Sequence, residues 1–158
     1  MKKKRIIRVG IILVVAGIVI AGSVGLYLFN MPHRNVQKAT ADYSLSSSQI
    51  VQEYLTDKES ADKKYLADDG DSKVLEITGM VSKVSEDFNN QKVVLLKGAD
   101  DKAGVSASFT TETNANAAKL QVGETVTVKG VIRSGAAFDE DLELYENVIL
   151  EKSDLATK

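Results

Sequence analysis

The sequence of 158 residues contains no cysteine and a single histidine, His33. Without cysteine the chain can form no disulfide, and it lacks the thiol to which the lipid of a lipoprotein is attached. A single histidine excludes a multi-histidine zinc site and removes the commonest agent of general acid–base catalysis. We therefore expect a protein that is not an enzyme, with no catalytic residue, metal or cofactor. The alternative is a carboxylate-dependent hydrolase, which the composition leaves open.

Charged side chains are absent from the 21 residues between Val9 and Phe29. About 20 apolar residues suffice for a helix to cross the hydrocarbon core of a bilayer. Five basic residues stand ahead of this stretch: Lys2, Lys3, Lys4, Arg5 and Arg8. The positive-inside rule then predicts a single-pass signal anchor, with the N-terminus in the cytoplasm and the C-terminal part outside. The alternative is a signal peptide cleaved near residues 21–23, although its apolar region is usually shorter.

Small residues recur every fourth position in this stretch, at Gly17, Ala21 and Gly25. This spacing places them on one face of a helix, where they would let a second helix approach closely. We interpret the three residues as a reflection of how common glycine and alanine are in such helices. The alternative is a homodimer formed through the membrane helix.

After Phe29 the chain carries 15 basic and 22 acidic residues, a net charge of −7. A nucleic-acid-binding protein needs a positive surface to replace counterions on phosphates, so this balance makes nucleic acid an unlikely partner. We expect instead an envelope protein or a small ligand. The predicted organisation is a basic tail (1–8), the anchor (9–29), a linker (30–44), one domain (45–152) and a short tail (153–158).

The domain is predicted to begin with one amphipathic helix that ends near Leu66. Ser46 and Gln49 have the spacing of a capping box, and Leu45 with Ile50 has that of a hydrophobic staple. Short β-type runs follow, separated by turn residues. They are residues 73–85, 92–97, 105–110, 125–132 and 142–150, with a short helix at 115–120. The loop at residues 87–91 is short enough to form a hairpin turn between the first two strands.

One helix followed by five strands, with a small helix between the third and fourth strands, predicts a mainly β fold, a five-stranded OB-fold Greek-key barrel. Glycine at position 79, within the first strand, is expected to mark a bend or bulge that lets the sheet curl.

The chain resembles a family of exported bacterial OB-fold proteins classified as tRNA anticodon-binding-like. The resemblance covers about residues 45–150 and is carried by four stretches: residues 61–65, 75–84, 123–130 and 146–148. It implies an OB-fold and an envelope location, so that the expected single-pass anchor would lie in the bacterial inner membrane. It supplies no catalytic residues, and the word tRNA in the family label implies nothing about the ligand of this chain.

Acidic clusters occur at Asp68, Asp69 and Asp71 and again at residues 139–141. Neither has the twelve-residue ligand spacing of a calcium loop, so we interpret both as solvated turns, with a weak cation site as the alternative. Ser106 and Ser108 lack a nucleophile-elbow pattern and are interpreted as ordinary strand residues. His33 is expected to have a structural or headgroup-contacting role, with pH sensing as the alternative.

OB-folds usually bind ligands across their second and third strands and the adjoining loops. Phe109 is predicted to lie in the barrel core. Phe88 and Phe138 fall in predicted loops, where they either cover the barrel ends or form a rim that binds a partner. The alternative function is binding of single-stranded nucleic acid or of an oligosaccharide by the OB-fold. For single-stranded nucleic acid, Phe88 and Phe109 would have to stack bases among three lysines. These lysines are Lys83, Lys92 and Lys97.

Overall fold

The computed structural model describes residues 14, 17–26, 35–68 and 71–156. The chain divides into two units, Met1–Asn35 and Val36–Lys158, and each is considered by itself. In the first unit residues 17–26 are helical, and the Ser23 hydroxyl donates to the Val19 carbonyl at 2.7 Å. The rest of the expected span (residues 9–13, 15–16 and 27–29), the five basic residues ahead of it, and His33 lie outside the described residues.

Within the described part of the chain, no helix is both long and apolar enough to cross a membrane.

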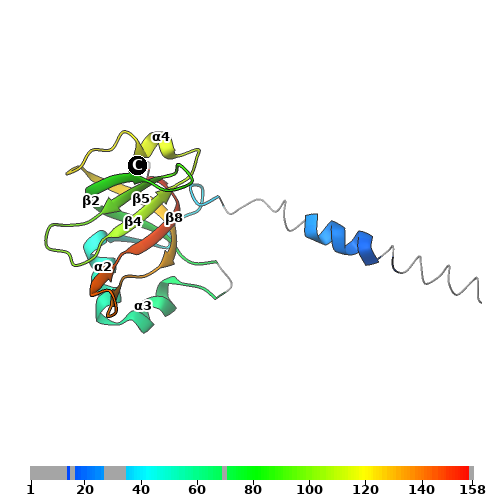
Figure 1. Ribbon diagram of the computed structural model, residues 1–158, viewed down its shortest axis with the longest axis horizontal. Coiled ribbons are helices and arrows are strands. Elements are labelled where there is room, and N and C mark those ends of the chain that lie inside the picture. Colours follow the sequence, from blue (N-terminus) through cyan, green and yellow to red (C-terminus); the bar gives the residue numbers. More distant parts are fainter. Residues whose placement is uncertain (1–13, 15–16, 27–34, 69–70, 157–158) are drawn as a thin grey trace, which may run out of the picture. The chain divides into compact units, whose positions relative to one another are not determined.

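The second unit contains a closed barrel of five strands with helices at its two ends (Figure 1). The barrel strands are β2 (Val74–Glu86), β3 (Lys92–Leu96), β4 (Val105–Phe109), β5 (Thr125–Ser134) and β8 (Val148–Leu155). They follow one another in the order β2-β3-β4-β8-β5, and β5 closes the barrel by pairing back onto β2. The β4–β8 pair is parallel and the other barrel pairs are antiparallel. The short helix α4 (Asn114–Ala117) lies between the third and fourth of these strands, so the predicted OB-fold is confirmed.

Strand β2 pairs with both of its neighbours in the closed barrel: its first half pairs with β5 and its second half with β3. The register with β3 shifts between Val81 and Lys83, just after Gly79. A Cβ at Gly79 would stand 2.6 Å from the Ser47 hydroxyl oxygen. The bend predicted here is therefore present, and the missing side chain also lets a helix pack closely on the strand.

The core fills the barrel because side chains alternate between its two faces along each strand. Apolar residues at every second position point inward, and each is at most 1% exposed. They include Ile77, Val94, Leu96, Val105, Ala107, Phe109, Val128, Ile132 and Leu150. Phe109 is thus a core residue, as predicted.

The single helix predicted to end near Leu66 is wrong in one respect, because it is two helices, α2 (Ser47–Thr56) and α3 (Lys58–Tyr65). Its predicted start is confirmed: the Gln49 amide donates to the Ser46 hydroxyl at 3.1 Å, and the Ser46 amide donates to Gln49 Oε1 at 2.8 Å. The break falls at Asp57, whose φ of −151° is not helical. Its carboxylate accepts hydrogen bonds from the Ser60 amide at 3.0 Å and the Ser60 hydroxyl at 2.7 Å, which caps a new helix.

The ordered domain begins earlier than the expected boundary at residue 45. Val36 is 3% exposed, and a short strand β1 (Tyr43–Ser46) pairs in parallel with β2. Just ahead of β1, the Asp42 amide donates to the Val74 carbonyl at 2.7 Å, while the Val74 amide donates to Asp42 Oδ2 at 2.8 Å. Residues 36–44 of the expected linker therefore belong to the domain, because their backbone completes the edge of β2.

The last predicted strand, residues 142–150, is wrong as one element. Residues Leu144–Glu146 form β7, which pairs with β6 (Ala137–Asp139) in a separate two-stranded hairpin. The barrel strand β8 begins at Val148 and runs to Leu155, into the expected tail. Asn147 separates the two strands because its side-chain oxygen accepts a hydrogen bond of 2.8 Å from the Gly104 amide.

Candidate binding face

The outer surface of β3 and β4 is the face through which OB-folds usually bind. Val93 and Leu95 of β3 stand opposite Ser108 and Ser106 of β4, and all four are half-buried. The two serines are strand residues on this outer face, in agreement with their interpretation from the sequence. The part of the face formed by these four residues is therefore narrow, partly apolar and uncharged.

The three lysines considered for nucleic-acid binding do not form a free basic groove. Lys92 Nζ makes an ion pair of 2.6 Å with Glu86, and Lys97 Nζ donates to the Lys102 carbonyl at 3.4 Å. Lys83 lies on β2 opposite Leu95. Since Phe109 lies in the core, no base can stack on it.

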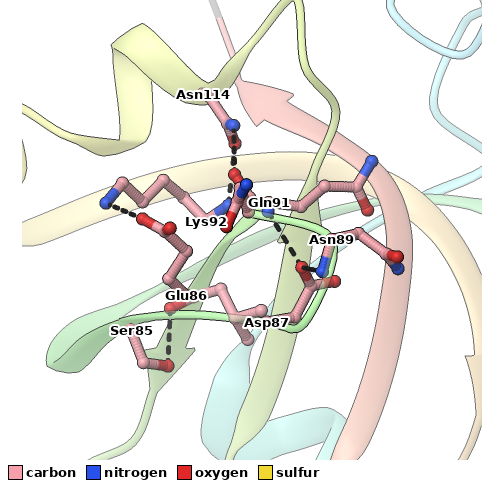
Figure 2. Close-up of polar contacts among 9 residues, drawn as sticks. Ser85, Glu86, Asp87, Asn89, Gln91, Lys92 and Asn114 are labelled. Atoms are coloured by element: carbon pink, nitrogen blue, oxygen red, sulfur yellow. Dashed lines mark hydrogen bonds and ion pairs between the residues drawn. The ribbon is translucent and has the colours of Figure 1, made fainter.

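A tight turn, residues 87–91, borders this face where β2 passes into β3 (Figure 2). One carboxylate oxygen of Asp87 accepts hydrogen bonds from the Asn89 amide at 2.8 Å and the Gln91 amide at 2.9 Å. The Asp87 amide also donates to the Gln91 carbonyl at 2.9 Å. Asn90 adopts a positive φ of 58°, a conformation that asparagine tolerates well. The sequence predicted this hairpin turn, and its hydrogen bonds fix the backbone.

The turn is also held from outside by α4. The Asn114 side chain accepts from the Lys92 amide at 2.7 Å and donates to the Asn90 carbonyl at 2.9 Å, as Figure 2 shows for Lys92. Phe88 stands on this braced turn and is fully exposed. It therefore does not cover the barrel end. Binding residues are often carried by loops that a rigid scaffold positions, and the turn 87–91 is such a loop.

Phe138, the other predicted rim residue, lies on β6 rather than in a loop, and it is 48% exposed. Its ring packs against that of Tyr145, with ring centres 4.8 Å apart, and the Lys102 ammonium lies 5.5 Å from the Tyr145 ring centre. The hairpin is bonded to Gly104, in the loop that follows β3, whereas the Phe88 turn precedes β3. The five residues of β3, roughly 16 Å of extended chain, thus separate the Phe88 turn from the β6–β7 hairpin. The structure does not bring Phe88 and Phe138 together on one rim.

A second concave surface, a groove of about 440 Å³, lies between α2 and α3. Polar side chains line most of it: Gln49, Gln52, Glu53, Thr56, Asp57, Ser60 and Lys64, with Ala61. Lys64 Nζ lies 2.9 Å from Glu53 Oε2, and the Tyr65 hydroxyl donates to the same oxygen at 2.8 Å.

These contacts change the acid–base properties of the groove. The hydrogen bond from Lys64 holds the pKa of Glu53 below its usual range, although burial acts against it. Hydrogen bonds with Tyr65 and Glu53 raise the pKa of Lys64. Tyr43 completes this cluster, with its ring centre 5.3 Å from that of Tyr65. The sequence analysis missed it because Tyr43 fell in the expected linker.

The described residues of the acidic clusters form no cation site. Asp139 Oδ1 accepts from the amides of Asp141 and Leu142 at 2.9 and 3.0 Å, which makes it a turn-forming residue. Asp68 is exposed, and Asp69 lies outside the described residues. Among the residues that the structure describes, no three His, Asp or Glu side chains gather in a way that could hold a metal ion.

A five-stranded barrel of this topology, with its helix between the third and fourth strands, defines an OB-fold domain. The chain belongs to the tRNA_anti-like family, whose model matches residues 1–141. Among solved structures it is similar to a candidate nucleic acid-binding lipoprotein from Klebsiella pneumoniae subsp. pneumoniae. That likeness has a TM-score of 0.52 and 14% sequence identity over 72% of this chain and 91% of the other, and it supports the shared fold alone. No curated protein matches the chain.

Proposed function

We propose that this chain is a single-pass membrane protein of the bacterial envelope that presents its OB-fold domain outside the cytoplasm as a non-enzymatic binding module. Its ligand in this proposal is an envelope protein or a small molecule, bound across β3 and β4 and the turn 87–91. The observation that carries the proposal is Phe88, a fully exposed ring on a turn fixed by its own hydrogen bonds.

The membrane part of the proposal rests on the uncharged run from Val9 to Phe29 behind five basic residues. The similar protein from Klebsiella pneumoniae is described as a lipoprotein, which supports an envelope location for this fold. This chain lacks cysteine, so its anchor would be the peptide segment itself.

The proposed binding role rests on the rigidity of the turn 87–91 and on the exposure of Phe88. Exposing an aromatic ring to water costs free energy, and a flexible loop could fold such a ring back onto the barrel. Asp87 and Asn114 prevent this by holding the turn from both sides. A turn whose backbone is already fixed loses little entropy when a ligand covers it, which favours binding.

A second candidate function is binding of single-stranded nucleic acid. The similar protein from Klebsiella pneumoniae is described as a candidate nucleic acid-binding lipoprotein, which favours this function, as do Lys83, Lys92 and Lys97 near the face. Two features count against it: the net charge of −7 after Phe29, and the pairing of Lys92 with Glu86.

Photocrosslinking in living cells tests the proposal at Phe88. Benzoylphenylalanine replaces Phe88 in the full-length chain, and in a matched control it replaces Val122, which is 70% exposed on another loop. We expect an adduct at position 88 in the membrane fraction and none at position 122. Equal or absent crosslinking at both positions would contradict the proposed face.

A fluorescence anisotropy titration separates the two candidates. Full-length protein in micelles is added to labelled oligo-dT at low salt and again at physiological salt. We expect no saturable binding. Binding that weakens steeply with salt and is lost in Lys83→Ala would establish the nucleic-acid function instead.

A further inference from the structure

The hairpin β6–β7 projects from the barrel and carries an unusual combination of side chains. Three large apolar residues on it are exposed: Phe138 to 48%, Leu142 to 67% and Leu144 to 45%. Five of the eight residues 139–146 are acidic, and no lysine or arginine occurs between Arg133 and Lys152. Apolar and negative groups therefore share one small protrusion.

The hairpin is fixed at its base, so this exposure is not the result of a loose loop. Ala136 is fully buried, and Gly135 lies against the ring of Tyr54. On the other strand, Asn147 accepts from the Gly104 amide, and the Val148 amide donates to the Gly104 carbonyl at 3.0 Å. At the tip, Asp139 closes the turn by accepting two backbone amides. The exposed side chains are thus presented on a braced scaffold.

We propose that this hairpin is a docking surface for a cationic, amphipathic polypeptide, a segment of a partner protein in which lysine or arginine alternates with apolar residues. The surface consists of Leu142 and Leu144 with the acidic side chains Glu140, Asp141, Glu143 and Glu146 around them. Phe138 pairs with Tyr145 on the opposite face of the hairpin, where the Lys102 ammonium also lies, and is not part of this surface.

The negative charge of the hairpin favours a cationic polypeptide over nucleic acid, an anionic bilayer, a second copy of this domain or a metal ion. Nucleic acid and anionic bilayers carry the same sign as the five carboxylates and are repelled. A second copy of this domain is itself acidic, so self-association through this surface is disfavoured. A metal ion needs convergent oxygens and gains nothing from the two leucines. A cationic polypeptide satisfies the carboxylates at the rim and covers the apolar centre, which is the usual anatomy of a protein interface.

The proposal is independent of the Phe88 face, because the hairpin lies at the other end of β3. A partner could therefore occupy the hairpin while a ligand occupies the turn 87–91.

Calorimetry tests the proposal with two synthetic peptides, one alternating leucine with lysine and one alternating leucine with glutamate. Each is titrated into the full-length chain in uncharged micelles. Association of a peptide with the micelle itself is the same for every variant, so differences between variants report on the domain. We expect the lysine peptide to bind saturably and the glutamate peptide not to bind.

Matched variants separate the hairpin from the general negative field of the domain. Glu140→Gln with Asp141→Asn should weaken binding of the lysine peptide by about tenfold, because two rim ion pairs are lost. Asp68→Asn with Glu112→Gln removes the same charge from exposed sites elsewhere and should leave the affinity unchanged. Leu142→Ser should weaken binding several-fold, whereas Val122→Ser, equally exposed, should not.

Four results would overturn the proposal. Equal losses in the two acid variants would show that only net charge matters. Equal binding of both peptides would remove the charge selectivity. A dimer, seen by sedimentation and abolished by Leu142→Ser, would assign the surface to a second copy of the chain. Loss of peptide binding in Phe88→Ala would place the peptide on the Phe88 face instead.

Discussion

Gly135 lies directly against the ring of Tyr54, so closely that a Cβ at position 135 would overlap the ring. This contact joins helix α2 to the chain segment between β5 and the β6–β7 hairpin. It therefore fixes the position of the hairpin base relative to the helices.

Gly135→Ala should destabilise the domain by about 1–3 kcal/mol, because the methyl group forces the ring or the backbone to move. Urea unfolding followed by circular dichroism measures this. Tyr54→Leu is the matched partner, since a smaller side chain leaves room for the methyl group. The double variant should be more stable than the sum of the two single effects predicts, and strict additivity would contradict the contact.

The two buried tyrosines of the helices should respond in opposite ways to loss of the hydroxyl. The Tyr54 hydroxyl is buried and has no hydrogen-bond partner among the described residues, whereas the Tyr65 hydroxyl donates to Glu53. Burial, reinforced by the negative charge of Asp62, raises the pKa of Tyr54. Tyr54→Phe should leave the free energy of unfolding unchanged or raise it by up to about 1 kcal/mol, while Tyr65→Phe should lower it by about 1–2 kcal/mol. A loss of stability in Tyr54→Phe as large as in Tyr65→Phe would contradict the assignment.

Acid should weaken the contact between α2 and α3 through Glu53. The pKa of this group is lowered from its ordinary 4.5 by the hydrogen bond from Lys64, so the folded state holds the carboxylate more strongly than the unfolded chain does. The resulting stabilisation is present above about pH 4.5 and is lost as the pH falls through the lower folded-state value. It amounts to less than about 1 kcal/mol, because the side chains of Glu53 and Lys64 are 38% and 39% exposed.

Melting temperatures between pH 7 and pH 3 measure this effect. The acid-induced decrease should be smaller in Glu53→Gln than in the natural chain. Glu59→Gln is the control, because the Glu59–Lys63 pair is 82% and 74% exposed and should contribute little. If the melting temperatures of the natural chain and of Glu53→Gln fell in parallel as the pH decreased, a contribution of Glu53 would be excluded.

The turn that carries Phe88 should depend on Asp87 and not on Phe88 itself. Asp87→Ala removes the acceptor for two backbone amides and should cost about 1–2 kcal/mol of stability, with faster amide hydrogen exchange at residues 89–91. Phe88→Ala should leave both quantities unchanged, because the ring is fully exposed. If Phe88→Ala were as destabilising as Asp87→Ala, the ring would have a packing role that excludes it as a free contact.

The barrel strands could be predicted because their core residues recur at every second position. This alternation is a local signal, since it does not depend on which strand is the pairing partner. Val126, Val128 and Ile132 illustrate this in β5. The capping box at Ser46 and the hairpin turn after Glu86 were equally local. In each case the residues that decide the structure lie within a few positions of one another.

The missed elements depend on contacts between distant parts of the chain. Strand β1 is four residues long and exists because it pairs with β2, about thirty residues later. The division between β7 and β8 is set by Asn147 reaching Gly104. Asp57 is different, since its bonds to Ser60 are local, but the apolar pattern runs on through it and hides the break.

The candidate site could be predicted only in part. Phe88 was identified because its loop was evident in the sequence, but its separation from Phe138 follows from the order of strands in the barrel. The dimer face at Gly17, Ala21 and Gly25 stays a prediction.

Cysteine labelling tests the central claim, that the OB-fold domain is displayed outside the cytoplasm by an N-terminal anchor. The chain contains no cysteine, so a single introduced thiol reports its own location. Asp68→Cys places the thiol at an exposed site of the domain, and Lys3→Cys places it ahead of the uncharged run. In intact cells a membrane-impermeant maleimide should label Asp68→Cys, and it should label Lys3→Cys only after lysis. Labelling of Asp68→Cys only after lysis, or recovery of the full-length chain from the soluble cytosolic fraction, would contradict the account.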